Sequence, residues 1–267
     1  MNHFKNILLY SFICSFVLFT NCGEDSDDVA ADADSDFIYL DENGVTVKAS
    51  ENAVIGGNYE LNGVNYFVVD KDLLFQMIAD EEDVTKVITS RITDMEGIFL
   101  LATAFNQDIS SWDVSNVIRM NSMFYSAKSF NQDISSWDVS RVEDMGGMFH
   151  DAKAFNQDIG TWDVSNVSLM TGMFKKASTF NQDLSSWNVS KVIDMIGMFD
   201  DAKAFNQDIG TWDVSNVTNM FGMFYLASAF NQDLSSWNVS NVTECEEFSL
   251  DATAWTLPKP NFTNCSE

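Results

Sequence analysis

The sequence predicts an α/β repeat fold, a β/α solenoid of about six to seven coils with a small β-hairpin region before it. The first observation is that Asp151–Val167 and Asp201–Val217 are identical 17-residue strings that start 50 residues apart. The second is that Phe-Asn-Gln-Asp, followed by a Trp seven residues after the Phe, returns every 25 residues between Phe105 and Trp237. The third is a hydrophobic content of 46%, which is enough for a continuous core. A fixed period of this length is typical of a solenoid.

The composition restricts the classes of partner. The 40 acidic residues outnumber the 14 basic ones, which gives a net charge of −26. Such a chain has little with which to neutralise phosphates, so no nucleic-acid partner is expected. The charge fits a hydrated, self-repelling surface that attracts cations.

Residues 1–21 are predicted to be a lipoprotein signal peptide. Lys5 precedes an apolar run over Ile7–Phe19, which is short for a membrane span. Cys22 follows, and Leu18–Cys22 resembles a bacterial lipobox, although Asn21 replaces the usual small residue. The alternative is an ordinary signal peptide with an incidental cysteine. We therefore expect export and a lipid anchor on Cys22 that holds the chain at the bacterial outer membrane, exposed at the surface.

Residues 22–36 are expected to form an acidic, disordered tether, because they are rich in Asp, Glu and Ala and have nothing to bury. Residues 37–83 are expected to form a β-hairpin and helix region that caps the solenoid. Apolar alternation there flanks Asn43-Gly44 and Asn62-Gly63, pairs that favour type I′ hairpin turns. A helix with Asp70 or Asp72 as its N-cap follows, and its apolar face holds Leu73, Leu74, Met77 and Ile78.

Residues 84–244 are assigned to the solenoid. Within one coil, Met120, Met123, Phe124 and Ala127 have the spacing of one helix face. The stretch Ile134–Val139 has the spacing L-x-x-L-x-L, whose last part predicts a short strand. We expect the Phe, Trp and Met positions to form the core and the Asn of each Asn-Gln-Asp to satisfy backbone groups at the turns.

The Asp of each Asn-Gln-Asp, from Asp108 to Asp233, forms a matching row. No cofactor is expected; turn capping explains these carboxylates, and calcium, which prefers several oxygen ligands, is the alternative.

The 25-residue unit, typified by Ala204–Ile209, Trp212–Val217, Met220 and Met223-Phe224, closely resembles the BspA-like leucine-rich repeat surface proteins, and related repeats occur in mycoplasma surface lipoproteins. The resemblance covers about residues 84–254. It implies a leucine-rich-repeat-like β/α solenoid displayed on a bacterial surface, with adhesion or binding of host and matrix proteins attributed to some members.

Residues 245–267 are predicted to be a C-terminal cap. Cys245 replaces the Met of the repeat and Cys265 lies 20 residues later, which in an exported chain indicates a capping disulfide. Two buried thiols are the alternative.

No enzyme is predicted, because His3 and His150 are the only histidines and the acids form an array of equivalent groups. The polar positions beside each Trp, which point outward from the predicted strands, are expected to form a strip that faces a ligand; the alternative is that the strip is only the solvated face of the sheet. Its members are Ser111, Asp113, Ser115, Ser136, Asp138, Ser140, Thr161, Asp163, Ser165, Thr211, Asp213 and Ser215, with Ser186, Asn188, Ser190, Ser236, Asn238 and Ser240 in the remaining coils.

The expected function is adhesion or interaction with an unidentified host, matrix or neighbouring-cell protein or glycan. A structural or spacer lipoprotein with no specific ligand is the alternative.

Overall fold

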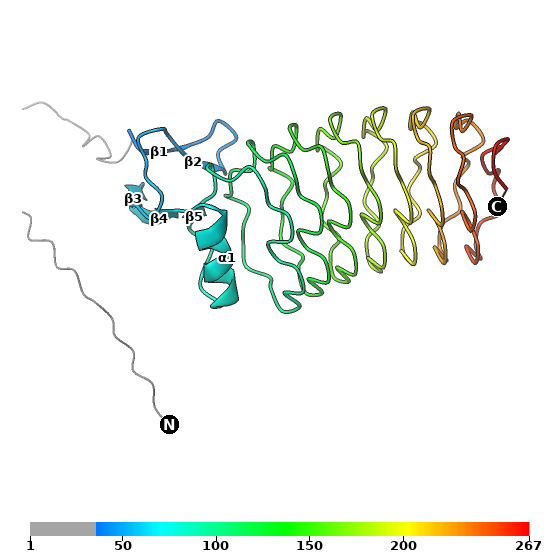
Figure 1. The fold of residues 1–267 in the computed structure, drawn as a ribbon. Helices are drawn as coiled ribbons and strands as arrows, with labels where there is room; N and C mark the ends of the chain where they lie inside the picture. Colours follow the sequence, from blue (N-terminus) through cyan, green and yellow to red (C-terminus); the bar gives the residue numbers. More distant parts are fainter. Residues whose placement is uncertain (1–35, 267) are drawn as a thin grey trace, which may run out of the picture. The chain divides into compact units, whose positions relative to one another are not determined.

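The computed structural model describes residues 36–266, which form an N-terminal cap followed by a stack of coils (Figure 1). The predicted signal peptide, the lipidated Cys22 and the tether as far as residue 35 lie outside the described residues. In the part that is described, no helix is long and apolar enough to cross a membrane.

The cap contains two small sheets. Strand β1 (Ile38–Leu40) pairs antiparallel with β2 (Val47–Ala49). Strand β3 (Asn58–Leu61) pairs antiparallel with β4 (Val64–Val68), which pairs in parallel with β5 (Val87–Ile88). These strands account for the small N-terminal β region that the alternating pattern predicts.

The two predicted hairpin turns differ. The type I′ turn at Asn62-Gly63 is confirmed, since both residues have positive φ (52° and 79°). The type I′ prediction at Asn43-Gly44 is wrong, because Gly44 has positive φ but Asn43 does not. The Asn43 side chain instead accepts hydrogen bonds from the N–H groups of Val45 and Thr46, which hold a wider loop.

Helix α1 (Lys71–Ala79) lies in the cap between β4 and β5, and Asp70 is its N-cap. The Asp70 carboxylate accepts a 2.9 Å hydrogen bond from the N–H of Leu73. Leu74 is fully buried, while Met77 and Ile78 pack partly buried against the same core as the coils. The apolar face predicted for this helix is therefore the face that contacts the solenoid.

Successive coils lie side by side in sequence order, from the green to the red part of Figure 1. The predicted core is confirmed: the Met, Phe and Trp positions of the repeat are at most 4% exposed from Trp112 to Trp237. The rings stack from coil to coil, as in Phe130 on Phe155 at 5.9 Å and Trp187 on Trp212 at 6.4 Å. One aromatic core thus runs through the whole array.

The helix predicted over Met120–Ala127 is wrong. This segment consists of consecutive turns, in which the N–H of Met123 donates to the carbonyl of Met120 and the N–H of Ala127 to that of Phe124. The third residue of both turns has positive φ, +56° at Ser122 and Ser126. Two such turns place their first and fourth residues inward, so they copy the spacing of a helix face.

The backbone of this segment bonds to the next coil. The N–H groups of Met120, Ser122, Phe124 and Ser126 donate to the carbonyls of Asp144, Gly146, Met148 and His150. The same alternation continues from coil to coil, and isolated parallel bridges link the residue before each Met, and before Cys245 in the last coil, from Asp94 to Glu244. The contacts between coils are therefore those of a parallel ladder.

The strand predicted in Ile134–Val139 is also wrong. Trp137 N–H donates to the carbonyl of Ile134, and Val142 N–H donates to that of Val139, so both parts are turns. The two apolar residues of the L-x-x-L spacing, Ile134 and Trp137, are the first and last residues of a turn. The fold is a 25-residue repeat structure with little regular secondary structure.

The predicted role of the repeat asparagines is confirmed. Asn131 donates its N–H to the Asn106 side chain at 2.9 Å, and the same bond recurs up to Asn231. Each Trp from Trp112 to Trp237 also donates its indole N–H to a carbonyl 28 residues earlier. These side chains bond coils to each other.

The C-terminal end is closed by the chain itself. A disulfide joins Cys245 to Cys265. Trp255 takes the position of the repeat Phe and packs edge-on against Phe230 with ring centroids 4.7 Å apart. The last coil therefore has both an aromatic cover and a covalent link.

Candidate functional site

The predicted strip runs along one row of turns rather than along a strand. Its middle positions, which lie 25 residues apart, are exposed at Asp138, Asp163, Asn188, Asp213 and Asn238. In several coils the Ser or Thr directly before the Trp donates its hydroxyl to the preceding coil, as Ser186 does to the Gly160 carbonyl at 2.6 Å. The middle carboxylates and amides are therefore exposed, together with the Ser or Thr before the Trp in the later coils, Thr161, Ser186, Thr211 and Ser236.

Each middle residue also caps its own turn. The Asp138 carboxylate accepts a 3.1 Å hydrogen bond from the N–H of Ser140, and Asp163 accepts one from Ser165 at 3.0 Å. Asn188 makes the equivalent bond to Ser190 with its amide oxygen. One oxygen of each side chain is thus committed to the backbone, as in other Asx-turns.

The prediction that Asp113 faces outward in the strip is wrong, because Asp113 is only 3% exposed. The cap covers it: Thr89 donates its hydroxyl to the Asp113 carbonyl at 2.8 Å, and Val47 donates its N–H to the carbonyl of Ser111. Burial lowers the pKa of Lys48, but its hydrogen bond to Asp41 and then the charge of Asp113 outweigh this and raise the pKa. The first coil therefore contributes no exposed carboxylate to the strip.

The electrostatics of the strip follow from these bonds. Hydrogen bonds from the Ser165 hydroxyl and N–H hold the pKa of Asp163 below its usual value, and Ser215 does the same to the pKa of Asp213. Both carboxylates are therefore ionised at neutral pH.

Two basic residues beside the strip were not part of the predicted set. Arg141 donates to the Asn116 side chain at 3.0 Å, and Lys191 donates to that of Asn166 at 2.6 Å. Both are exposed, and the Lys191 charge contributes to the low pKa of Asp163. The signal for them was in the sequence, since each stands at the Asn position that follows the serine of its unit.

The Asp row that could have held calcium also caps turns. The carboxylates of Asp133, Asp158 and Asp208 accept from the N–H groups two residues later, at 2.9 Å. Among residues 36–266, no group of three or more His, Cys, Asp or Glu side chains is placed to hold a metal ion. The capping explanation accounts for these carboxylates.

His150 lies against the Tyr125 ring, with centroids 4.3 Å apart. Burial lowers the pKa of His150, and the charges of Lys175 and Lys176 lower it further.

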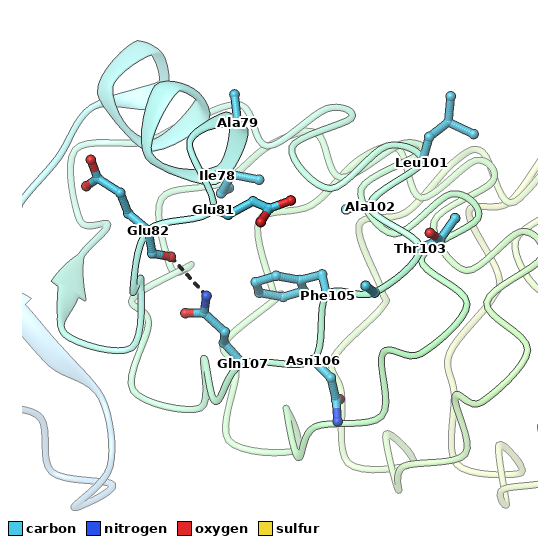
Figure 2. Close-up of a pocket in the computed structure, with 11 residues that line it drawn as sticks. Ile78, Ala79, Glu81, Glu82, Leu101, Ala102, Thr103, Phe105, Asn106 and Gln107 are labelled. Carbon is cyan, nitrogen blue, oxygen red and sulfur yellow. Dashed lines mark hydrogen bonds between the residues drawn. The ribbon is translucent and has the colours of Figure 1, made fainter.

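A cavity of about 590 Å³ lies between the end of α1 and the first coil (Figure 2). Ile78 and Ala79 line it from the helix, and Leu101 and Ala102 line it from the coil. The Phe105 ring points into the space between these two walls, and the side-chain amide of Gln107 donates to the Glu82 carbonyl at 2.9 Å. This cavity was not predicted from the sequence.

Residues 71–179 and 155–258 match the family described as "Mycoplasma protein of unknown function, DUF285". The chain belongs to this family. Neither a curated protein nor a solved structure matches it. Both the exposed strip and the cavity fall within the matched parts of this DUF285 protein.

Proposed function

We propose that this DUF285 protein is a non-enzymatic surface lipoprotein that uses its repeat array for adhesion, by binding a protein or glycan of a host, a matrix or a neighbouring cell. The observation that carries this proposal is the regular row of exposed carboxylates at Asp138, Asp163 and Asp213. Each is held in place by its own turn, so little ordering is lost on binding.

The charges beside the row favour recognition of a polar partner. Arg141 and Lys191 place cationic groups among the carboxylates, and arginine is enriched at binding hot spots. The strip has serine and threonine around these charges. Such a surface suits weak contacts repeated from coil to coil, whose combined strength comes from multivalency.

The resemblance to leucine-rich-repeat surface proteins supports the same proposal and adds a family relation, an anchor and a location. In this proposal the chain is a relative of the BspA-like surface proteins whose coils are built from turns. Its anchor is a lipid on Cys22, and its location is the bacterial outer membrane with the array outward.

A spacer function is the second candidate, and the capping role of the strip favours it. The carboxylates of Asp138 and Asp133 make the same bond to the backbone two residues later. A row that serves only to stabilise turns would need no ligand.

The two candidates can be separated with matched variants of the full-length chain on a panel of glycans and matrix proteins. The test variant D138N/D163N/D213N removes three charges and keeps the capping oxygens, as Asn188 and Asn238 do naturally. The control D133N/D158N/D208N removes three charges from the other Asp row, which caps turns in the same way.

Adhesion through the strip predicts that the test variant loses binding while the control retains it. Equal loss in both variants would mean that only the net charge matters. No binding by the unmodified chain to any member of the panel would favour the spacer.

The anchor is tested separately by metabolic labelling with a fatty acid in the producing bacterium. Cys22→Ala should abolish the label, whereas Cys245→Ala should not. Retention of the label in the Cys22 variant would contradict the proposed lipidation.

A further inference from the structure

The cap continues the register of the repeat for part of one coil. Val84, Val87 and Ile92 are buried 25 residues before Ile109, Trp112 and Val117. The indole N–H of Trp112 donates to the Val84 carbonyl, as that of Trp137 donates to the Ile109 carbonyl, and both pairs are 28 residues apart. The cap thus replaces the turn that would precede the first coil.

In this register the cap has no aromatic residue at the position that Phe occupies in each coil. The residue 25 positions before Phe105 is Asp80, the exposed C-cap of α1. Phe105 stacks on Phe130 at 6.0 Å on one side, and the cavity lies against it on the other. Consequently Phe105 is half-buried, whereas Phe130 and its later equivalents are fully buried.

The opposite end of the aromatic row is filled by the chain. Trp255 covers Phe230, and the N–H groups of Thr256 and Leu257 donate to the Asn231 side chain at 2.8 and 3.0 Å. The row is therefore closed after Phe230 and open before Phe105.

A backbone donor is also left over at the open end. From Asn131 to Asn231, each asparagine N–H donates to the side chain of the asparagine one coil earlier. The residue one coil before Asn106 is Glu81, which offers no equivalent side-chain acceptor. The N–H of Asn106 therefore has no acceptor among residues 36–266. Asn106 lines the cavity, so an oxygen bound there could accept this hydrogen bond.

The walls and rim define the chemistry of an occupant. Ile78, Leu101 and the Phe105 ring are apolar, and Leu101 is 63% exposed. Glu81 and Glu82 line the same cavity and are exposed; in Figure 2 the Glu81 carboxylate lies over the Phe105 ring, whereas the Glu82 side chain points away from the ring at the outer edge. The site therefore combines an aromatic floor with negative charge at its edge.

We propose that this cavity binds an aromatic side chain of a partner polypeptide that is flanked by lysine or arginine. The partner's ring stacks on Phe105 and completes the aromatic row. An oxygen of the next residue accepts from the Asn106 N–H, and the charges of Glu81 and Glu82 attract the basic residues. This site is separate from the aspartate strip and does not depend on the function proposed for it.

The probe is the peptide acetyl-Lys-Phe-Asn-Lys-amide, titrated into the full-length chain while the Asn106 amide is followed by NMR. Saturable binding with a shift of that amide is expected. Replacing the peptide Phe by Leu, or both Lys by Glu, should weaken binding at least several-fold. Equal affinity for all three peptides would overturn the proposal.

Variants of the protein supply the matched controls. F105L should weaken binding by about two- to tenfold, the range that one aromatic pair provides, whereas F230L at the closed end should not. E81Q/E82Q should weaken binding at low salt but not at high salt, and E246Q/E247Q should leave it unchanged.

Thermal unfolding of each variant verifies that it is folded before titration, and D138N/D163N/D213N should bind the peptide like the unmodified chain. Unchanged affinity in folded F105L would refute stacking on Phe105. An effect of E246Q/E247Q equal to that of E81Q/E82Q would refute the local role of the two carboxylates.

Discussion

Replacing Gly172 by alanine tests whether each coil is built from turns. Gly172 has a φ of +60°, and an added Cβ would meet only Lys175 Cβ at 3.8 Å and His150 Nδ1 at 4.0 Å. There is room for the methyl group, so the cost is the left-handed backbone alone, about 1–2 kcal/mol. In a helix the same change would stabilise the protein by about 0.8–1 kcal/mol. A turn-built coil and a helical coil therefore predict opposite signs for the change in unfolding free energy.

The assay is urea unfolding, comparing midpoints at a constant slope. Gly222 has a φ of +57° and similar space, so G172A/G222A should cost about the sum of the two single changes. Gly172→Asn should recover much of the loss, because asparagine adopts the left-handed region more readily than alanine. A higher midpoint for G172A would refute the turn-based coil.

Three further predictions concern the links between coils and the last cap. Asn181→Ala removes the acceptor of the Asn206 N–H and should cost about 1–3 kcal/mol in urea unfolding, whereas Asn181→Asp, which keeps an acceptor oxygen, should cost less. Cys265→Ser should free Cys245 for thiol labelling in the unfolded chain and lower stability by roughly 3 kcal/mol, and no change in either measurement would contradict the role of the disulfide as a clamp. Burial of Asp94 opposes its ionisation, but hydrogen bonds from Arg119, the Glu96 N–H and Lys71 prevail and lower its pKa from 3.8 to about 2. Because the folded-state pKa is the lower one, ionised Asp94 stabilises the fold above about pH 4, and this contribution disappears as the pH falls towards 2. Asp94→Asn should therefore lose less stability than the unmodified chain between pH 5 and pH 2, and parallel losses would contradict this role.

The sequence was sufficient to predict the core, because the period and the apolar positions do not depend on how the backbone turns. It was not sufficient to distinguish a helix from two successive turns, since both place residues i, i+3, i+4 and i+7 on one side. A signal for the turns was present. Glycine occupies the third position in five of the seven coils, at Gly97, Gly147, Gly172, Gly197 and Gly222, and all five have positive φ.

The candidate sites depend more strongly on tertiary contacts. Asp113 belongs to the same repeat position as Asp138, and it is buried only because the cap packs on the first coil. The cavity at Phe105 arises because the cap supplies Val84 and Val87 in register but has Asp80 where a ring would stand. Aligning the cap with the repeat would have revealed the missing ring, but the space beside it required the position of α1.

The most direct test of the coil structure is an NMR measurement of scalar couplings across hydrogen bonds. In the structure the Phe174 N–H donates to the carbonyl of Met198 in the next coil. A coupling between the Phe174 nitrogen and the Met198 carbonyl carbon is the predicted result. A coupling from the Phe174 nitrogen to the Met170 carbonyl carbon, four residues earlier, would show a helix and contradict the turn-built coil.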